Sequence, residues 1–177
     1  MPGEVQQLIE GAKTASKLYG RRNATLILML YRHALRVTEG INLEWNNIFL
    51  DNRTIHVSRL KNSDDSTHYL EDDELIELQW LRQTFPKSKF VFCTRSQKQL
   101  ARRTVHQIVA TAGISAQLPF PVHPHMLRHA KGYQLANKNA HMRAIQKYLG
   151  HKSIQHTALY TEMSPERFKD FGLGDLS

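Results

Sequence analysis

Apolar positions recur along most of the chain at the spacing of amphipathic helices, three or four residues apart. The pattern predicts longer helices at 23–34, 72–85, 99–112 and 141–149. Another helix is expected after Pro124, because proline suits a first helical turn, where its missing N–H is not needed. Shorter helices are expected from Thr38, from Ser153 and over 165–171. The chain is therefore predicted to be mainly helical.

One region alternates instead between apolar and polar residues. Ile55 and Val57 are flanked by Thr54, His56 and Ser58, which is the two-residue period of a half-buried strand. Short strands are expected at 48–50, 54–60 and 67–70, with polar turns at 51–53 and 61–66. These strands make the expected fold class α+β.

Residues 1–20 carry the weakest pattern. Val5, Leu8 and Ile9 give only one weak helical turn, and a basic stretch then leads into the first firm helix. The basic residues of this stretch are Lys13, Lys17, Arg21 and Arg22. We interpret 1–20 as an N-terminal arm that lies against DNA phosphates, with a loose terminus as an equally good alternative. Residues 21–177 are expected to form one domain.

Composition narrows the class of protein. The chain has 177 residues, 41% of them apolar, which is enough for one ordinary core. A formal charge of +8 and a pI near 9.7 favour a polyanionic partner, nucleic acid first. The lone Cys93 excludes an internal disulfide and fits a reducing cytoplasm. We find no apolar run long enough to cross a membrane and no signal-peptide pattern.

The candidate chemistry is concentrated between residues 123 and 161. His125 and Arg128 are three residues apart and share one face of a predicted helix. A neutral imidazole accepts a proton near pH 7, and a guanidinium holds two phosphate oxygens in one plane. His151 follows the next helix, just past Gly150, and Tyr160 comes nine residues later. Taken singly, each has an ordinary structural explanation; a base and an anion clamp on one helix face would form half of a phosphoryl-transfer site.

A second candidate lies upstream. Arg36 falls at the junction of two predicted helices, a place that holds a side chain rigidly. Glu39 follows in the first turn of the second helix, where the helix dipole favours a carboxylate. It either braces Arg36 by charge or is an ordinary first-turn acid.

These motifs, in this order, resemble the tyrosine recombinase (phage integrase) family. The resemblance rests on His-x-x-Arg at 125–128, Leu-Gly-His at 149–151, Tyr160, the His-Ala-Leu-Arg-Val-Thr-Glu segment at 33–39, and Lys61 within Arg-Leu-Lys-Asn at 59–62. It covers residues 24–168, nearly the whole chain. The details of 58–61 and 124–130 look most like the fimbrial phase-variation recombinases, which invert a promoter-bearing DNA segment.

The resemblance implies a fold and a reaction. The fold would be the tyrosine recombinase catalytic domain, with a small three-stranded antiparallel sheet on one side. Tyr160 would attack a phosphodiester and leave a 3′-phosphotyrosyl link and a free 5′-hydroxyl. Because that link stores the energy of the broken bond, no cofactor is implied. Two arginines and a lysine would supply the positive charge that a metal ion would otherwise bring to the site, so no metal is implied either.

The same resemblance assigns roles around the tyrosine. Arg36 and Arg128 would hold the nonbridging oxygens and stabilise the transition state. His125 would assist proton transfer from the nucleophile. Lys61 would protonate the leaving 5′-oxygen, and His151 would donate a further hydrogen bond.

The implied partner is double-stranded DNA with inverted-repeat recombination sites. Four strand cuts imply a homotetramer on DNA, with a monomer or weak oligomer in its absence. DNA-bending accessory proteins and a nucleoid location are further expectations. Additional DNA contacts are expected from Lys13, Lys17, Arg21, Arg22, Arg59, Arg102 and Arg103. Surface solvation is the alternative for Arg102 and Arg103, and Phe168 and Phe171 either dock on a neighbouring protomer or fold back.

Several alternatives remain open. A mobile-element integrase or excisionase and a type IB topoisomerase would use the same chemistry. A DNA-binding regulator would keep the fold without catalysis. A metal phosphodiesterase would use His123, His125 and His129 as ligands, although no carboxylate lies beside them.

Overall fold

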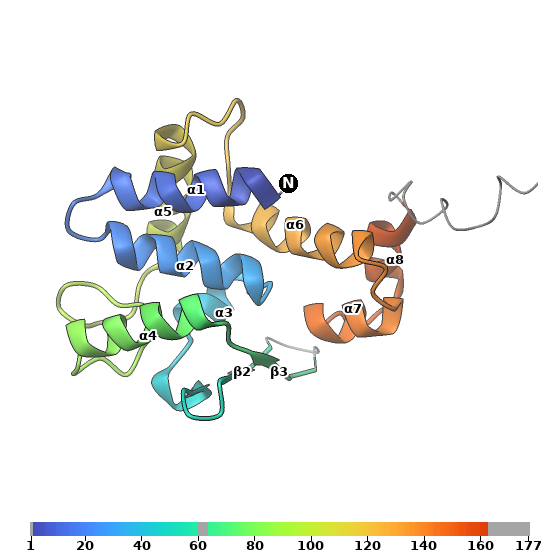
Figure 1. Ribbon diagram of the computed structural model, residues 1–177, viewed down its shortest axis with the longest axis horizontal. Coiled ribbons are helices and arrows are strands. Elements are labelled where there is room, and N and C mark those ends of the chain that lie inside the picture. The colour runs from blue at the N-terminus through green and yellow to red at the C-terminus, as the bar shows by residue number, and fades with distance from the viewer. Residues whose placement is uncertain (1, 60–63, 163–177) are drawn as a thin grey trace, which may run out of the picture.

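The computed structural model describes residues 2–59 and 64–162 (Figure 1). The helices are α1 (Pro2–Ala15), α2 (Gly20–Arg32), α3 (Val37–Ile41), the 3-10 turn η1 (Trp45–Asn47), α4 (Asp72–Thr84), α5 (Arg102–Ser115), α6 (Pro124–Asn137), α7 (Met142–Leu149) and α8 (Gln155–Glu162). The strands are β1 (Ile48–Phe49), β2 (Thr54–Val57) and β3 (Ser66–Tyr69). The predicted α+β, mainly helical class is confirmed.

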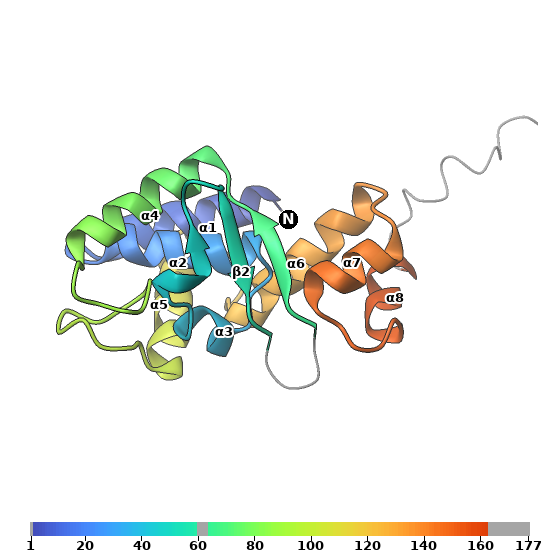
Figure 2. The same cartoon turned by 90° about the horizontal axis from the view of Figure 1, so that it is seen from below.

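The strands form one antiparallel sheet in the order β1-β2-β3. Ile55 is paired with Ile48 on one side and His68 on the other, and both Ile55 and Val57 are fully buried. The predicted alternation is therefore correct, although β2 ends at Val57 rather than at residue 60. Figure 2 shows the sheet on one side of the molecule, with β3 facing α6 and α7.

The helices are divided between two hydrophobic cores. The larger core joins α1, α2, α4 and α5 with the sheet, and the smaller one consists of Ala34, Ala136, Ile145, Leu149 and Tyr160. Figure 1 shows α6 running from the larger group to α7 and α8. This long helix therefore connects the two cores, and the turn after α2 meets the smaller one.

The prediction of an N-terminal arm is wrong for residues 2–15, which form a helix packed into the larger core. Val5, Leu8, Ile9 and Ala12 are buried against α2 and α5. Their i, i+3, i+4, i+7 spacing is that of an apolar helix face. At Gly11 the helices approach so closely that a Cβ would lie 2.4 Å from the carbonyl oxygen of Ala112.

Smaller differences concern helix ends. Helix α2 begins at Gly20, three residues before the predicted Asn23, and α5 begins at Arg102 rather than at residue 99. The helix expected over 165–171, with Phe168 and Phe171, lies outside the described residues. Within the described ranges, no helix is long and apolar enough to cross a membrane.

Candidate active site

The turn between α2 and α3 positions Arg36. Ala34 has a positive φ of 50°, which reverses the chain after α2, and Arg36 becomes the N-cap of α3. The Glu39 carboxylate accepts hydrogen bonds from the Arg36 backbone N–H at 2.8 Å and from its Nη1 at 2.6 Å. Of the two alternatives for Glu39, the structure shows the bracing one.

Glu39 is 5% exposed and is ionised in this environment. Burial by itself would raise the pKa of its carboxyl, but the neighbouring Arg59 and Arg36 outweigh this and hold the pKa below its usual value. The carboxylate therefore remains an acceptor for both guanidinium groups.

Arg128 projects from α6 and is 2% exposed. Its Nη1 donates to the carbonyl of Ala34 at 2.6 Å, and its Nη2 donates to the carbonyl of Leu149. Burial, together with the repulsion of Arg36, lowers the pKa of Arg128 to about 10, which leaves it charged at neutral pH. This arginine thus joins the end of α2 to the end of α7.

Tyr160 packs against α6 and is 4% exposed. Its hydroxyl lies 2.8 Å from Nδ1 of His129. Its ring contacts Tyr133 edge-on at 5.1 Å between centroids and stacks with His151 at 6.1 Å. Burial raises the pKa of the phenol, and Arg128 partly opposes that shift.

The two predicted histidines come from α6 and from the turn after α7. His125, on α6, contacts His129 with their ring centroids 4.4 Å apart. His151 follows the left-handed Gly150, and its Nδ1 lies 3.1 Å from the hydroxyl of Thr157. Burial, helped by Arg128, lowers the pKa of His151 to about 4. Burial, helped by His129, also lowers the pKa of His125. Both imidazoles are therefore neutral near pH 7.

The predicted residues lie close enough to Arg128 to influence one another's charge. In addition to burial, the positive charge of Arg128 lowers the pKa of His125 and His151, and it opposes the rise that burial causes in the pKa of Tyr160. Arg36 likewise adds to the effect of burial in lowering the pKa of Arg128. The structure thus brings together Arg36, His125, Arg128, His151 and Tyr160. Lys61 lies outside the described residues.

Sequence reasoning missed His129 as the partner of Tyr160. It had entered only as one ligand of an alternative metal site with His123 and His125. In the described part of the chain, no three His, Cys, Asp or Glu side chains are grouped to hold a metal, so that alternative lacks its site. The available signal was the four-residue spacing from His125, which puts both rings on one helix face.

Two basic residues predicted to contact DNA are buried instead. Arg22 is 5% exposed and donates to the carbonyl of Cys93 at 2.8 Å and to the side chain of Asn23. Arg59 is 8% exposed and pairs with Glu39. Neither prediction agrees with the structure, because both guanidinium groups are covered by the protein and bonded away from its surface.

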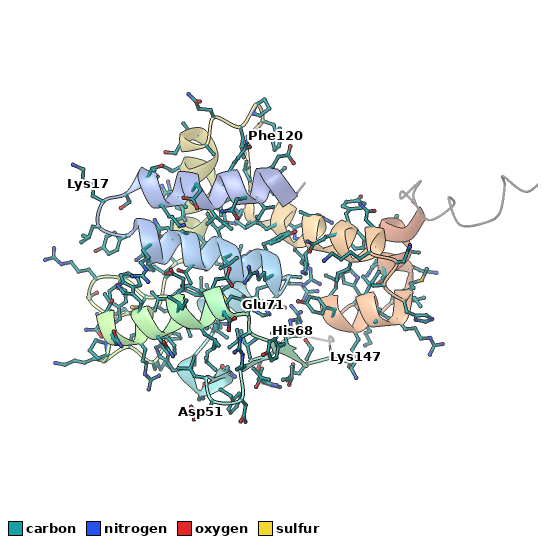
Figure 3. All side chains as sticks on the ribbon, in the orientation of Figure 1. Lys17, Asp51, His68, Glu71, Phe120 and Lys147 are labelled. Atoms are coloured by element: carbon teal, nitrogen blue, oxygen red, sulfur yellow. The ribbon has the colours of Figure 1, made fainter. Side chains whose placement is uncertain are left out.

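The other basic residues remain candidates for DNA contact. Lys17, Arg102 and Arg103 are exposed. Lys13 pairs with Glu10, and Arg21 pairs with Glu77. Figure 3 shows Lys17 extending from the α1–α2 turn, at the end of the molecule opposite to α7 and α8. Lys17 is therefore remote from the cluster of candidate catalytic residues.

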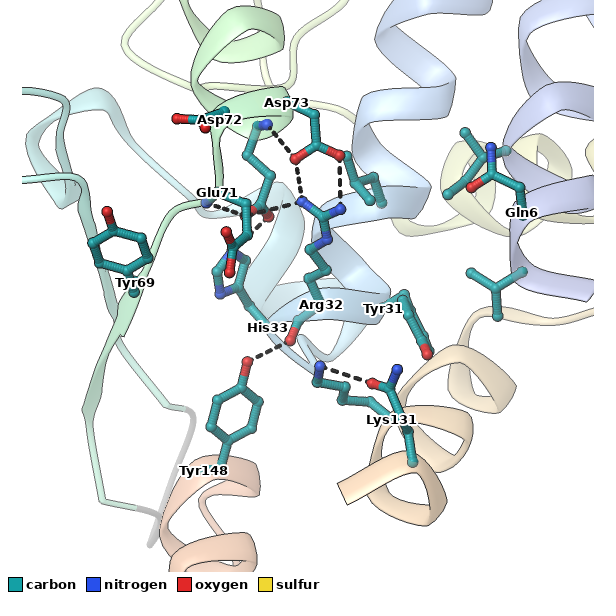
Figure 4. Close-up of a pocket in the computed structure, with 15 residues that line it drawn as sticks. Gln6, Tyr31, Arg32, His33, Tyr69, Glu71, Asp72, Asp73, Lys131 and Tyr148 are labelled. Atoms are coloured by element: carbon teal, nitrogen blue, oxygen red, sulfur yellow. Dashed lines mark hydrogen bonds and ion pairs between the residues drawn. The ribbon is translucent and has the colours of Figure 1, made fainter. Parts of the chain in front are cut away.

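A pocket of about 670 Å³ lies beside this cluster, not within it. Figure 4 shows its wall, where the Tyr148 hydroxyl donates to the carbonyl of Arg32 at 2.5 Å. Next to it, His33 lies 2.9 Å from a carboxylate oxygen of Glu74 and 3.1 Å from His68. Among the described residues, none of those predicted to be catalytic lines the pocket, and its network ties α2 to α4, β3 and α7.

Comparisons with known proteins give consistent matches. Residues 2–167 match the model described as the phage integrase family. The chain is 37% identical over 155 residues to the type 1 fimbriae regulatory protein FimE of Escherichia coli K12, covering 84% of this chain and 78% of FimE. It is 37% identical over 177 residues to FimB of the same strain, covering 97% and 86%.

A solved structure shows the same fold. The XerH site-specific recombinase, in a post-cleavage complex with a palindromic difH substrate, matches with a TM-score of 0.80 and 23% identity. The match covers 96% of this chain and 50% of XerH. The family match begins at residue 2 and therefore includes the segment that forms α1.

Proposed function

This protein belongs to the phage integrase family and is a site-specific tyrosine recombinase acting on DNA; we propose that it inverts a DNA segment, using Tyr160 as its nucleophile. The observation that supports this proposal most directly is the position of the phenol, between His129, His151 and the Arg128 charge. In the proposed step the phenolic oxygen bonds to phosphorus and the bond to the 5′-oxygen breaks. The 5′-oxygen takes up a proton, and the reverse reaction with another 5′-hydroxyl rejoins the strands.

Arg128 has donors left for the scissile phosphate, but it is 2% exposed, so the phosphate would reach it only after the shift that also exposes Tyr160. A guanidinium has five N–H donors, and the carbonyls of Ala34 and Leu149 occupy only part of them. Arg36, which is about one-third exposed and braced by Glu39, supplies a second cation. The two arginines would hold the nonbridging oxygens and stabilise charge that develops in the transition state.

The histidines act as neutral groups in this proposal. If Nδ1 of His151 accepts from Thr157, its Nε2 carries the proton and donates to the phosphate. Tyr160 is 4% exposed, so α8 or its neighbours must shift for the phenol to reach DNA. His129 is the proton acceptor in contact before that shift, and His125, one turn earlier on α6, is the proposed acceptor after it. Lys61 is proposed to protonate the 5′-oxygen.

The proposed biological role is a fimbrial phase switch, in which a promoter segment between inverted repeats is turned around. Support comes from 37% identity to two proteins named type 1 fimbriae regulatory proteins, over most of both chains. We further propose that the protein acts as a tetramer on paired sites. It would be located in the cytoplasm, associated with the nucleoid, and assisted by DNA-bending proteins. Residue chemistry alone is equally compatible with integration or excision, because the orientation of the two sites decides that outcome.

The first test traps the covalent intermediate. The protein is incubated with a nicked duplex carrying one inverted repeat from the DNA next to its gene, with EDTA present, and run on a denaturing gel. A slow protein–DNA band with wild type, absent with Tyr160→Phe, is expected. No band with wild type on DNA that it binds would refute the nucleophile and leave a regulator without catalysis.

The second test uses plasmids. One carries the two repeats inverted, one carries them as direct repeats, and one carries none. Inversion of the first plasmid and excision from the second are expected. Relaxation of the plasmid that carries no repeat would instead indicate a topoisomerase.

A further inference from the structure

We propose that Arg59 is a positioning residue that aligns Arg36 and the turn carrying His151 for phosphate binding. The inference rests on the proposed transesterification. Arg59 was expected to contact DNA, but its side chain is fully buried and makes its hydrogen bonds within the protein. Its acceptors come from α3 and from the ends of α2 and α7: Glu39 at 2.7 Å, Tyr148 at 2.6 Å, His33 at 3.2 Å and Ala34 at 3.3 Å.

The first link runs through Glu39 to Arg36. Oxygen Oε2 of Glu39 accepts from Arg59 Nη1 at 2.7 Å and from the Arg36 backbone N–H at 2.8 Å. The other oxygen, Oε1, accepts from Arg36 Nη1 at 2.6 Å. Arg59 therefore fixes the carboxylate that in turn orients the partly exposed Arg36 side chain.

The second link runs to the end of α7. The carbonyl of Tyr148 lies in the last turn of that helix, where it has no partner further along the helix. Gly150 adopts a φ of 64°, and a Cβ there would lie 3.0 Å from Cγ, Cδ and Nε of Arg59. The arginine thus packs against the turn from which His151 emerges.

The third link is to the end of α2. The carbonyls of His33 and Ala34 both accept from Arg59, and Arg128 shares the Ala34 carbonyl. A cation at the carboxyl end of a helix is favoured by the dipole. Because one planar group serves all these acceptors, lysine cannot replace it.

A purely structural role for Arg59 predicts lower stability but a normal rate of chemistry while the protein is folded. A positioning role predicts a slow chemical step with DNA binding preserved, since a misplacement of about 1 Å near the reacting atoms typically costs about 100-fold in rate. The test therefore compares Arg59→Lys and Arg59→Met with Arg22→Met. Arg22 is another buried arginine bonded to a backbone carbonyl, but its acceptors are Cys93 and Asn23, outside the catalytic cluster.

Single-turnover cleavage of the nicked duplex is measured at saturating protein, at a temperature where circular dichroism shows each variant folded. Binding is measured separately by mobility shift. We expect both Arg59 variants to bind DNA within about twofold of wild type and to cleave roughly 100-fold more slowly. We expect Arg22→Met to cleave at the wild-type rate. An Arg59→Lys protein that is folded and cleaves like Arg22→Met would overturn the proposal.

A methylphosphonate at the scissile position separates alignment of Arg36 from other effects. Replacing one nonbridging oxygen by methyl removes the charge that Arg36 would neutralise. The Arg36→Ala and Arg59→Lys defects should therefore shrink together on this substrate. An Arg59→Lys defect of equal size on both substrates would refute the link to Arg36.

The double variant Arg36→Ala/Arg59→Lys completes the cycle. If part of the Arg59 effect passes through Arg36, the double variant should be slowed by less than the product of the two single defects, and any slowing beyond Arg36→Ala alone measures the link to His151. Independent, multiplying defects would contradict the proposal. Absence of a covalent band with wild type would refute the proposed function itself, so the two failures are distinguishable.

Discussion

Tyr160 and His129 are joined by a hydrogen bond of 2.8 Å between the phenol and Nδ1, across the interface of α8 and α6. Burial lowers the pKa of His129, with Arg128 adding to the shift, so its ring is neutral, and in the tautomer protonated at Nε2 the Nδ1 atom accepts the phenolic proton. The bond holds the proposed nucleophile against α6, in a position from which it must move to reach a phosphate. Loss of this bond should therefore loosen α8.

For His129→Phe, we expect faster amide hydrogen exchange over 155–162 in the DNA-free protein. The phenol would lose its acceptor, and an unsatisfied buried hydroxyl typically costs about 1–3 kcal/mol. The double variant His129→Phe/Tyr160→Phe is the control, because it has no hydroxyl left to satisfy and should regain protection. Equal exchange in wild type and His129→Phe would show that the bond does not hold α8.

Gly132 is the position where α6 and Tyr160 approach most closely. In Gly132→Ala, the new Cβ would lie 2.8 Å from the tyrosine ring, so the ring or α8 must shift. We expect a loss of roughly 1–3 kcal/mol in the free energy of unfolding, which outweighs the better helix propensity of alanine. Urea unfolding measures this change.

Gly3→Ala is the matched control for Gly132→Ala. Gly3 also lies in a helix, but its Cβ would meet nothing within 4 Å. We expect this variant to be neutral or slightly stabilised. If both glycine variants behaved alike, close packing of Tyr160 on α6 would be disproved.

Leu8→Ala tests whether α1 belongs to the folded core. Leu8 is 2% exposed, and truncating such a leucine typically lowers the free energy of unfolding by about 2–5 kcal/mol. Leu18→Ala, at a leucine that is 68% exposed, should change it by less than about 0.5 kcal/mol. A Leu8 variant as stable as the Leu18 variant would restore the interpretation of residues 1–20 as an arm.

Stability should fall as the pH is lowered from about 6.5. Burial lowers the pKa of His68 to about 3 and that of His151 to about 4, whereas an unfolded histidine titrates near 6.5. Between these values the unfolded chain binds more protons than the folded one, so acid favours unfolding. This destabilisation is absent above pH 6.5. It grows as the pH falls, until about pH 4 for His151 and about pH 3 for His68.

Urea unfolding at pH 7, 6 and 5 would measure this slope. Carboxyl groups with lowered pKa values, such as Glu39 and Glu74, add their own acid sensitivity at lower pH, so the range is kept above their titration. His68→Gln should flatten the slope. A wild-type stability that is constant from pH 7 to 5 would rule out neutral, buried histidines.

The sequence by itself determined most of the secondary structure and the identity of the candidate site. The α4 and α6 helices begin at the predicted Asp72 and Pro124, and three strands form where alternation occurs. The resemblance to a family motif named His125, Arg128, His151 and Tyr160 as one site, and the structure brings these residues together. These features are encoded locally, because helix periodicity, strand alternation and capping depend on neighbours a few residues away.

Only the tertiary structure decided which arginines face solvent and what holds Tyr160. Arg59 binds a carbonyl 89 residues away, Arg22 binds one 71 residues away, and His129 meets Tyr160 across 31 residues. In the sequence a buried arginine and a DNA-binding arginine look alike, because a side chain's burial is set by segments that fold against it from elsewhere in the chain. The helix at residues 2–15 was missed for the same reason, since its few apolar positions become a core face only when α2 and α5 cover them.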